Sequence, residues 1–258
     1  MADPKEHGTI RIGTSGWNYD HWAGPFYPED LPTTRWLEEY SRHFDAVEVN
    51  NTFYNLPSAS TLRDWKDTVC DGFVFAVKAS RYITHMKKLK DPTDSTRHFV
   101  DRVEELGDAL GPLLFQLPPR WAFDAERLRA FLEVLGSRHR IVVEPRDRSW
   151  FDPEAYSILG DHGASLCIYE LAGFRSPRRL TTDLVYVRLH GPGKAYEGSY
   201  DDRTLQGWAG ALSSWAASGR DVHCYFDNDE KAYAVRNAAR LRDMLDGAGG
   251  QPRSCGRP

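Results

Sequence analysis

The sequence predicts a single α/β domain folded as a (β/α)8 TIM barrel, and three observations lead to this prediction. Short apolar runs recur eight times along the 258 residues, a stretch of helical periodicity follows most of them, and no Pro/Gly/Ser-rich linker divides the chain. Alternating β and α elements indicate a parallel sheet, and eight repeats in about 250 residues fit a closed barrel. The alternative is an open doubly wound sheet, but segment 13–16 never completes the G-x-G-x-x-G pattern typical of that fold.

The expected strands are segments 10–14, 45–50, 73–78, 112–116, 140–144, 165–170, 184–190 and 222–227. Apolar residues at i, i+3 and i+4 predict helices over 33–44, 58–69, 95–110, 124–137 and 201–219. Segment 171–183 is short and broken by Gly and Pro, so we expect the sixth crossover to be an irregular loop rather than a regular helix. The barrel domain is expected over residues 9–246. Disordered tails are expected at 1–8 and 247–258, which offer little apolar area to offset the entropy of ordering.

Composition narrows the class of protein. A chain with 41% hydrophobic and 12% aromatic residues supplies a sizeable core. Its net charge of −4, from 33 basic and 37 acidic residues, lacks the basic excess of proteins that bind nucleic acid mainly through phosphates, so a nucleic-acid partner is disfavoured. The sequence contains no signal peptide, no run of eighteen apolar residues and no C-x-x-C pair. We therefore expect a cytoplasmic protein without a membrane span.

The alternation of side chains along a strand predicts where the polar residues meet. In segment 184–190 one face carries only valine and leucine, and the other carries Tyr186, Arg188 and His190. Polar residues also end other predicted strands, and all carboxyl ends of a parallel barrel share one rim, where such folds hold their catalytic groups. The residues expected to converge there are Glu48, Asn50, Lys78, Gln116, Glu144, Arg146, Arg188 and His190.

A cavity that binds a ligand explains these residues better than ion pairs that merely fill the barrel, because desolvating each ion costs several kcal/mol. The two glutamates face three cations in this set, which leaves one excess positive charge for an anionic or sugar-like ligand. Aromatic residues in the following loops can stack on such a ligand or simply pack. Further candidate ligand contacts in these loops are Tyr54, His85, Trp150, Tyr196, Tyr200 and Asn228.

Seven blocks of sequence carry a family resemblance. They are GTSGW at 13–17, EVNNTFY at 48–54, FAVK at 75–78 with ITH at 83–85, FQLPP at 115–119, EPR at 144–146 with SW at 149–150, YVRLHG at 186–191 and YFDN at 225–228. In this order they resemble the YecE-like family (domain of unknown function 72) over residues 10 to 245. The resemblance implies a TIM barrel and implies little about activity. Its fold has been likened to that of the xylose isomerase and endonuclease IV group, which is an analogy only.

The first functional hypothesis is an enzyme that performs acid/base chemistry on an anionic or polyhydroxylated small molecule. Glu48 and Glu144 are the expected proton-transfer pair, because unequal surroundings can keep one ionised and raise the pKa of the other. His190 is expected to relay protons near neutral pH, and Lys78 is a further catalytic candidate that could instead form a Schiff base. The arginines would clamp the ligand. Hydrolysis, isomerisation and lyase chemistry stay open, and no cofactor is predicted.

Two other hypotheses stay open. A metal-assisted phosphoesterase like endonuclease IV would need ligands from His85, His190, Glu48, Glu144 and Asp227. The sequence has no H-x-H or H-E-x-x-H spacing, and three strand-borne cations lie among these residues, so no metal is predicted. A non-enzymatic binding protein could use the same cavity.

Overall fold

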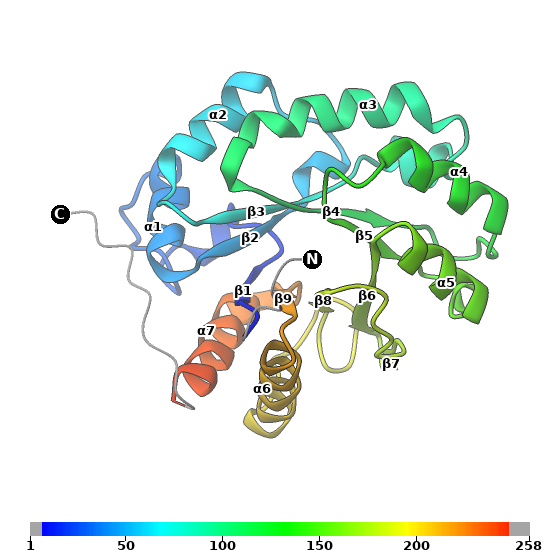
Figure 1. Cartoon of the computed structure of the whole chain (residues 1–258). Helices are drawn as coiled ribbons and strands as arrows, with labels where there is room; N and C mark the ends of the chain where they lie inside the picture. The colour runs from blue at the N-terminus through cyan, green and yellow to red at the C-terminus, as the bar shows by residue number, and fades with distance from the viewer. Residues whose placement is uncertain (1–6, 248–258) are drawn as a thin grey trace.

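The computed structural model describes residues 7–247 and shows eight parallel strands ringed by helices, as Figure 1 shows. The sheet runs in the order β1-β9-β8-β6-β5-β4-β3-β2. The eight strands are β1 (Ile10–Thr14), β2 (Ala46–Val49), β3 (Val74–Lys78), β4 (Leu110–Gln116), β5 (Ile141–Glu144), β6 (Ala164–Leu171), β8 (Leu184–Leu189) and β9 (Asp221–Phe226). Every predicted strand is therefore confirmed, with small shifts at the ends.

The helices cover the outside of the sheet. They are α1 (Trp36–His43), α2 (Ala59–Thr68), α3 (Pro92–Val103), α4 (Ala125–Leu135), α5 (Pro153–Asp161), α6 (Asp202–Ala217) and α7 (Tyr233–Asp246). Four of them begin after a side chain that accepts a hydrogen bond from a backbone N–H of the first turn, namely Ser58, Asp124, Asp152 and Asp201. The helix predicted over 95–110 ends earlier, because Gly107 has φ 53 and ψ −128, which no helix accommodates.

The sixth crossover, from β6 to β8, is irregular as predicted. It contains the short strand β7 (Phe174–Arg175), which turns back and pairs antiparallel with the end of β6. The remainder of the crossover has no helix. The predicted tails lie almost entirely outside the described residues, although Gly8 and Gly247 each donate a backbone hydrogen bond to the domain.

The seam between β1 and β2 closes the barrel in an unusual way. Only one isolated bridge, between Ser15 and Glu48, joins these strands directly. Between them lies the Tyr40 hydroxyl, which accepts from Thr14 N at 2.9 Å and donates to the Ala46 carbonyl at 3.2 Å. A side chain thus replaces a backbone ladder bond and satisfies buried polar groups that the seam would otherwise leave unpaired.

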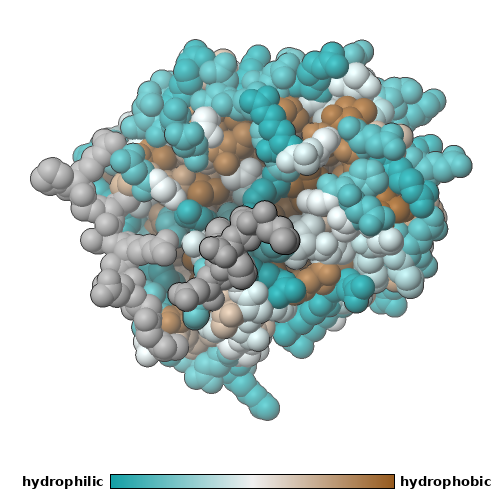
Figure 2. All heavy atoms as spheres, in the orientation of Figure 1, coloured by the Kyte–Doolittle hydropathy of each residue, from teal (hydrophilic) through white to brown (hydrophobic). Residues whose placement is uncertain are grey.

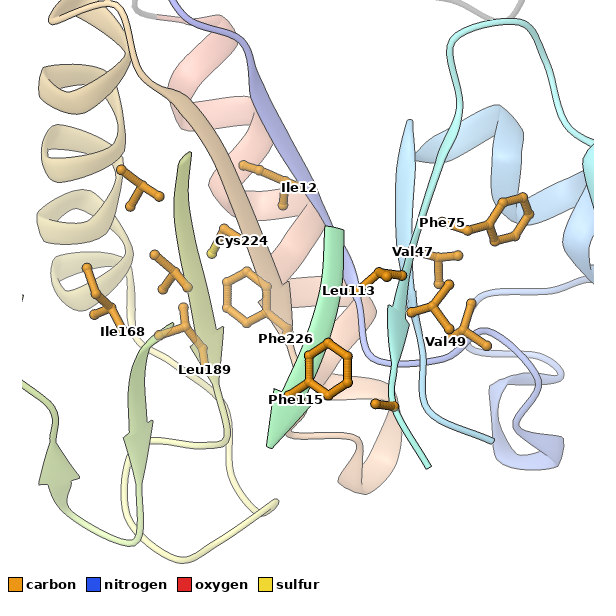
Figure 3. Packing of buried hydrophobic residues seen from close by; sticks show 14 of the residues in the cluster. Ile12, Val47, Val49, Phe75, Leu113, Phe115, Ile168, Leu189, Cys224 and Phe226 are labelled. Atoms are coloured by element: carbon orange, nitrogen blue, oxygen red, sulfur yellow. The ribbon is translucent and has the colours of Figure 1, made fainter. Parts of the chain in front are cut away.

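Alternate strand residues build two separate hydrophobic layers. The larger layer lies between the strands and the helices, and Figure 3 shows part of it, including Val47, Phe75, Phe115, Ile168, Leu189 and Phe226. The smaller one fills the barrel interior and consists of Ala46, Ala76, Leu114, Val142, Cys167, Tyr169, Leu184, Tyr186 and Tyr225. The amino-terminal part of the barrel interior is therefore packed with apolar side chains. The polar residues on the inward faces of the strands lie nearer the carboxyl ends.

On the face drawn in Figure 2, hydrophilic residues predominate around the periphery, and hydrophobic residues show between them. Among residues 7–247, no helix has both the length and the apolar character that crossing a bilayer requires.

Candidate active site

The carboxyl end of the barrel interior holds a dense group of charged side chains. The alternation that sends Val187 and Leu189 of β8 into the helix layer turns Arg188 inward. Strands β2, β5 and β9 contribute Glu48, Glu144 and, directly after its last residue, Asp227. The predicted convergence of distant residues on this end of the barrel is what the contacts show.

Arg188 lies at the centre of this group and is completely buried. Its Nε and Nη2 donate to both oxygens of Glu48, at 2.9 and 2.7 Å. Its Nη1 donates to Glu144 Oε2 at 2.7 Å, and its Nη2 also donates to Asp227 Oδ2 at 3.0 Å. One guanidinium therefore holds three carboxylates, which is possible because its planar fork offers five donors.

Glu48 is saturated with donors. Besides Arg188, the Ser15 hydroxyl donates to its Oε1 and the Tyr186 hydroxyl donates to its Oε2 at 2.7 Å. Burial raises the pKa of Glu48, but the adjacent guanidinium and these hydrogen bonds outweigh burial, so the pKa lies below its usual value. Glu144 is equally buried, between Arg188 and Arg146 Nε. The role of these glutamates as the proton-transfer pair stays a prediction, and their complete burial among donors favours a positioning role instead.

His190 is held as a neutral imidazole. Its Nδ1 lies 3.0 Å from the Glu170 carbonyl, to which it donates, and its Nε2 lies 2.9 Å from both Arg188 Nη1 and Arg146 Nη2. Burial and the two arginines keep the pKa of His190 well below its ordinary value. These contacts disfavour the predicted relay of protons near neutral pH, because Nε2 accepts from guanidinium donors and a positive charge on it would be repelled by both.

Lys78 is the exception in this group of charges. Its Nζ lies 4.4 Å from the centre of the Phe53 ring, and no hydrogen bond or ion pair to a carboxylate joins it within residues 7–247. Burial, and then the positive charge of Arg188, lower its pKa to about 8. The residue is only partly buried at the end of β3, so its amine borders the mouth of the barrel.

Asp227 is the second group at the mouth. Its side chain is 14% exposed, and Oδ2 lies 3.0 Å from Arg188 Nη2 and 3.4 Å from His190 Nε2. Burial raises its pKa to about 6, although Arg188 opposes the shift. With Asp227 included, three carboxylates balance the cations of Lys78, Arg146 and Arg188. The excess positive charge expected from the sequence is therefore absent.

Aromatic side chains border the mouth. Tyr196 is 48% exposed, and its ring centre lies 5.6 Å from that of His190. Tyr54 is 65% exposed and stands edge-on to Phe53, as does His85 from the neighbouring loop after β3. These three predicted ligand contacts have side chains that a ligand at the mouth could reach.

Two predicted ligand contacts with amide side chains also lie at the carboxyl ends of strands. Asn50 follows β2, and its Oδ1 is buried without a hydrogen-bond partner among the described residues. Gln116 ends β4, in register with Glu144 of β5, and is partly exposed. An acceptor that is buried and unpaired costs about 1–3 kcal/mol, so Asn50 is a good candidate to receive a ligand hydroxyl.

Three other predicted contacts face away from the mouth. Trp150 is 2% exposed, and its indole donates to the Trp121 carbonyl at 2.7 Å, so it packs the β4 and β5 loops together. The buried Tyr200 hydroxyl accepts from Gly191 N at 3.0 Å in the helix layer. Asn228 is completely buried and donates to Asn237 Oδ1 at 2.9 Å. All three residues hold loops in place, so a ligand-binding role for them stays a prediction that these contacts do not favour.

The sequence suggests Asp227 only as a possible metal ligand and Tyr186 only as an inward-facing neighbour of Arg188, and Ser15 is not among the predicted site residues. The alternation of side chains along β1, β8 and β9 identifies all three residues. Each stands an even number of positions from another inward-facing residue of the same strand. The same count places Tyr169 inward and Glu170 outward, where Glu170 pairs with Arg175 at 2.9 Å.

Comparison with known sequences gives a decisive match. The family described as "Protein of unknown function DUF72" matches residues 11–256. The chain belongs to the DUF72 family. The UPF0759 protein YunF of Bacillus subtilis (strain 168) is 27% identical over 274 aligned positions, which cover 92% of this chain and 95% of YunF. The UPF0759 protein YecE of Escherichia coli (strain K12) is 32% identical over 145 positions, which cover 55% of this chain and 50% of YecE.

Solved structures of DUF72 proteins share the fold. One from Thermotoga maritima superimposes with a TM-score of 0.83 at 27% identity, covering 92% of this chain and 99% of that one. Another from Enterococcus faecalis gives a TM-score of 0.77 at 19% identity and covers 92% and 96% of the two chains. The resemblance expected from the seven sequence blocks is confirmed, and so is the TIM barrel.

Proposed function

We propose that this DUF72 protein is an enzyme that performs acid/base chemistry on an anionic or polyhydroxylated small molecule bound at the carboxyl end of the barrel. One observation carries the proposal: Arg188 engages Glu48, Glu144 and Asp227 together, while Lys78 is left without a carboxylate partner at the mouth. Ion pairs that served only to fill the barrel would pair every cation. Burying Lys78 without a counterion destabilises the fold, and a function at this amine explains that cost.

Asp227 and Lys78 replace the glutamates as the proposed proton-transfer groups. The pKa of Asp227 is raised to about 6 and that of Lys78 is lowered to about 8, so the two values bracket neutral pH. At pH 7 a carboxylate base and an ammonium acid are then present together, which is the arrangement that acid/base catalysis requires. Arg188 is a positioning residue in this scheme, because it fixes Asp227 and keeps it ionised.

The ligand class follows from the groups left unpaired. The Lys78 ammonium can pair with a ligand carboxylate or phosphate or donate to a hydroxyl, and the buried Asn50 Oδ1 can accept from a hydroxyl. His85 and Tyr196 border the same space. A small hydroxylated molecule, with or without an anionic group, meets these requirements. Such a substrate is in keeping with action in the cytoplasm, which we retain as part of the proposal.

A metal-assisted phosphoesterase fits these residues less well. Within residues 7–247, no three His, Cys, Asp or Glu side chains are arranged to hold a metal ion. The carboxylates that would serve as ligands already bind Arg188, and His190 Nε2 faces two guanidinium groups. We therefore derive no step through a metal. A nucleic-acid substrate stays disfavoured because the chain has a net charge of −4 and no excess of basic residues.

The test is a comparison of turnover among variants. The wild-type protein is incubated with a mixture of small hydroxy acids, aldoses and sugar phosphates, and mass spectrometry follows the loss of substrate and the gain of product. Asp227→Asn and Lys78→Met are expected to lower turnover at least 100-fold, and the exposed Glu154→Gln on α5 serves as a matched control. Recovery of an unchanged ligand from the wild type would instead favour a binding protein, and full activity in both variants would overturn the proposal.

The pH dependence gives a second readout. Turnover should rise as Asp227 loses its proton near pH 6, and in non-covalent acid/base chemistry it should fall as Lys78 loses its proton near pH 8. The bell-shaped profile should lose its acidic limb in Asp227→Asn.

A further inference from the structure

Lys78 is chemically unusual among the lysines of this protein. Arg188 contacts all three carboxylates of the barrel interior, whereas the direct contact described for Lys78 Nζ is with the face of the Phe53 ring. Two exposed lysines, Lys194 and Lys231, lie within 4 Å of a glutamate. Lys78 is largely buried and contacts no carboxylate directly, although Asp227, Glu144 and Glu48 act on its charge from a longer distance.

The backbone around Lys78 is fixed. Thr52, in the short 3-10 helix η3 (Asn51–Phe53), donates its hydroxyl to the Lys78 carbonyl at 2.6 Å and to the Val49 carbonyl at 3.1 Å. These bonds tie the end of β3 to the end of β2. Phe53 follows directly in η3 and covers the amine with its ring, so the position of Nζ is set by packing on two sides.

A desolvated amine without a counterion loses its proton easily and then acts as a nucleophile. The pKa of Lys78, lowered to about 8 by burial and by Arg188, makes the neutral amine available at neutral pH. Relative to an exposed lysine of ordinary pKa, the neutral fraction at pH 7 is larger by about two orders of magnitude. A fixed amine that is partly neutral at pH 7, in the same site as a carboxyl that can donate a proton, is the arrangement needed to capture a carbonyl carbon.

We propose that Lys78 forms a Schiff base with an aldehyde or ketone group of the ligand, an inference that rests on the proposed function of this site. The nitrogen lone pair attacks the carbonyl carbon, and the oxygen takes up a proton to give a carbinolamine. The nitrogen then loses a proton, the hydroxyl leaves as water after protonation, and a C=N bond forms. Nothing is oxidised or reduced, and water reverses the reaction.

Asp227 is the group that supplies and recovers the proton in this scheme. Its carboxyl is partly exposed at the same mouth, and the charges of Asp227 and Lys78 influence each other. A carboxyl whose pKa is raised to about 6 is protonated often enough to help the hydroxyl leave. The substrate class is thereby narrowed to hydroxylated or anionic molecules that carry a carbonyl.

The inference is tested by reductive trapping. The full chain is incubated at pH 7 with glyceraldehyde or with pyruvate, in the presence of cyanoborohydride, and the adduct sites are mapped by mass spectrometry of peptides. We expect an adduct at Lys78 that forms at least ten times faster than adducts at the exposed Lys88 and Lys90. Lys78→Arg, which retains the positive charge, should lose this fast adduct while its circular dichroism stays unchanged.

Failure of the inference and failure of the proposed function give different results. Adducts that spread over the exposed lysines, with Lys78 no faster than they are, would overturn the covalent step. If Asp227→Asn still abolished turnover in that case, non-covalent acid/base chemistry would stand. If Lys78 were trapped rapidly but Asp227→Asn and Lys78→Met kept full turnover, the covalent reactivity would stand and the proposed function would fall.

Discussion

Arg188 and Glu48 form a completely buried bidentate ion pair that joins β8 to β2 through the interior of the barrel. Arg188 Nε lies 2.9 Å from one Glu48 oxygen, and Arg188 Nη2 lies 2.7 Å from the other. The same guanidinium also neutralises Glu144 and Asp227. Its removal would leave three carboxylates in a site from which water is largely excluded, and such uncompensated charges are far more costly than the pair itself is stabilising.

Arg188→Ala is therefore expected to lower the free energy of unfolding by about 3–5 kcal/mol at pH 7. The loss should shrink toward pH 4, because the carboxylates of the variant can take up protons and become neutral. Urea unfolding at several pH values measures this change. Arg129→Ala, which breaks an exposed pair with Glu154, should cost less than about 1 kcal/mol. A loss for Arg188→Ala that matched this control would contradict the buried network.

Gly13 permits the close approach of β1 to β2. A Cβ at this position would meet the Ala46 carbonyl oxygen at 2.1 Å, so Gly13→Ala must push the seam apart. We expect a loss of at least 2 kcal/mol in the free energy of unfolding, as for other overpacked cores. Gly210→Ala is the matched control in α6, where a Cβ meets nothing within 4 Å, and it should stabilise the protein by about 0.5–1 kcal/mol. Thermal unfolding should show a lower melting temperature for Gly13→Ala and a higher one for Gly210→Ala than for the wild type.

Lys78→Met is expected to stabilise the protein. The folded pKa of Lys78 is about 8 and the ordinary value is 10.5, so the unfolded chain binds more protons between these pH values. The penalty for burying the ammonium is then complete below pH 8 and disappears as pH rises to 10.5. Methionine removes up to about 3 kcal/mol of it at pH 7. The free energies of unfolding of the variant and the wild type should converge above pH 10. A variant that is less stable than the wild type at pH 7 would contradict the prediction, because it would show that the surroundings of Lys78 stabilise its charged form.

His190 should remain neutral through the physiological range. Two guanidinium groups lie 2.9 Å from its Nε2, and burial opposes a charge, so the pKa of His190 stays well below its ordinary value. Nitrogen NMR of the imidazole should show a proton on Nδ1 and none on Nε2, without titration from pH 8 to pH 5. The exposed His43 on α1 provides the comparison in the same spectra. Titration of His190 within that range would restore it as a proton relay.

Local patterns predicted the fold well, because period-two alternation and helix caps are properties of neighbouring residues. The inward position of Arg188, Glu48 and Lys78 followed from the same alternation. The pattern does not show that Arg188 and Glu48, 140 positions apart, saturate each other, because that depends on the stagger of strands around a closed barrel. For the same reason the alternation pattern does not distinguish a glutamate at the mouth from one buried beneath it.

Loop aromatics were the other weak point. Trp150 and Tyr196 both follow a strand end, yet Trp150 packs beneath a neighbouring loop and Tyr196 stands beside His190. An aromatic ring is equally suited to packing and to stacking on a ligand, so residue type alone does not separate the two. The direction of the loop decides, and glycines and long-range hydrogen bonds set that direction.

The titration of Lys78 tests the central claim most directly. Lysine side chains labelled with ¹³C are followed by NMR from pH 6 to pH 12, and the Lys78 signal is assigned by its loss in Lys78→Arg. A buried amine without a direct carboxylate contact, close to the charge of Arg188, should titrate near pH 8. If the Lys78 signal instead titrates near 10.5, the ordinary value for lysine, the destabilised amine at the mouth does not exist, and the chemistry proposed for it has no basis.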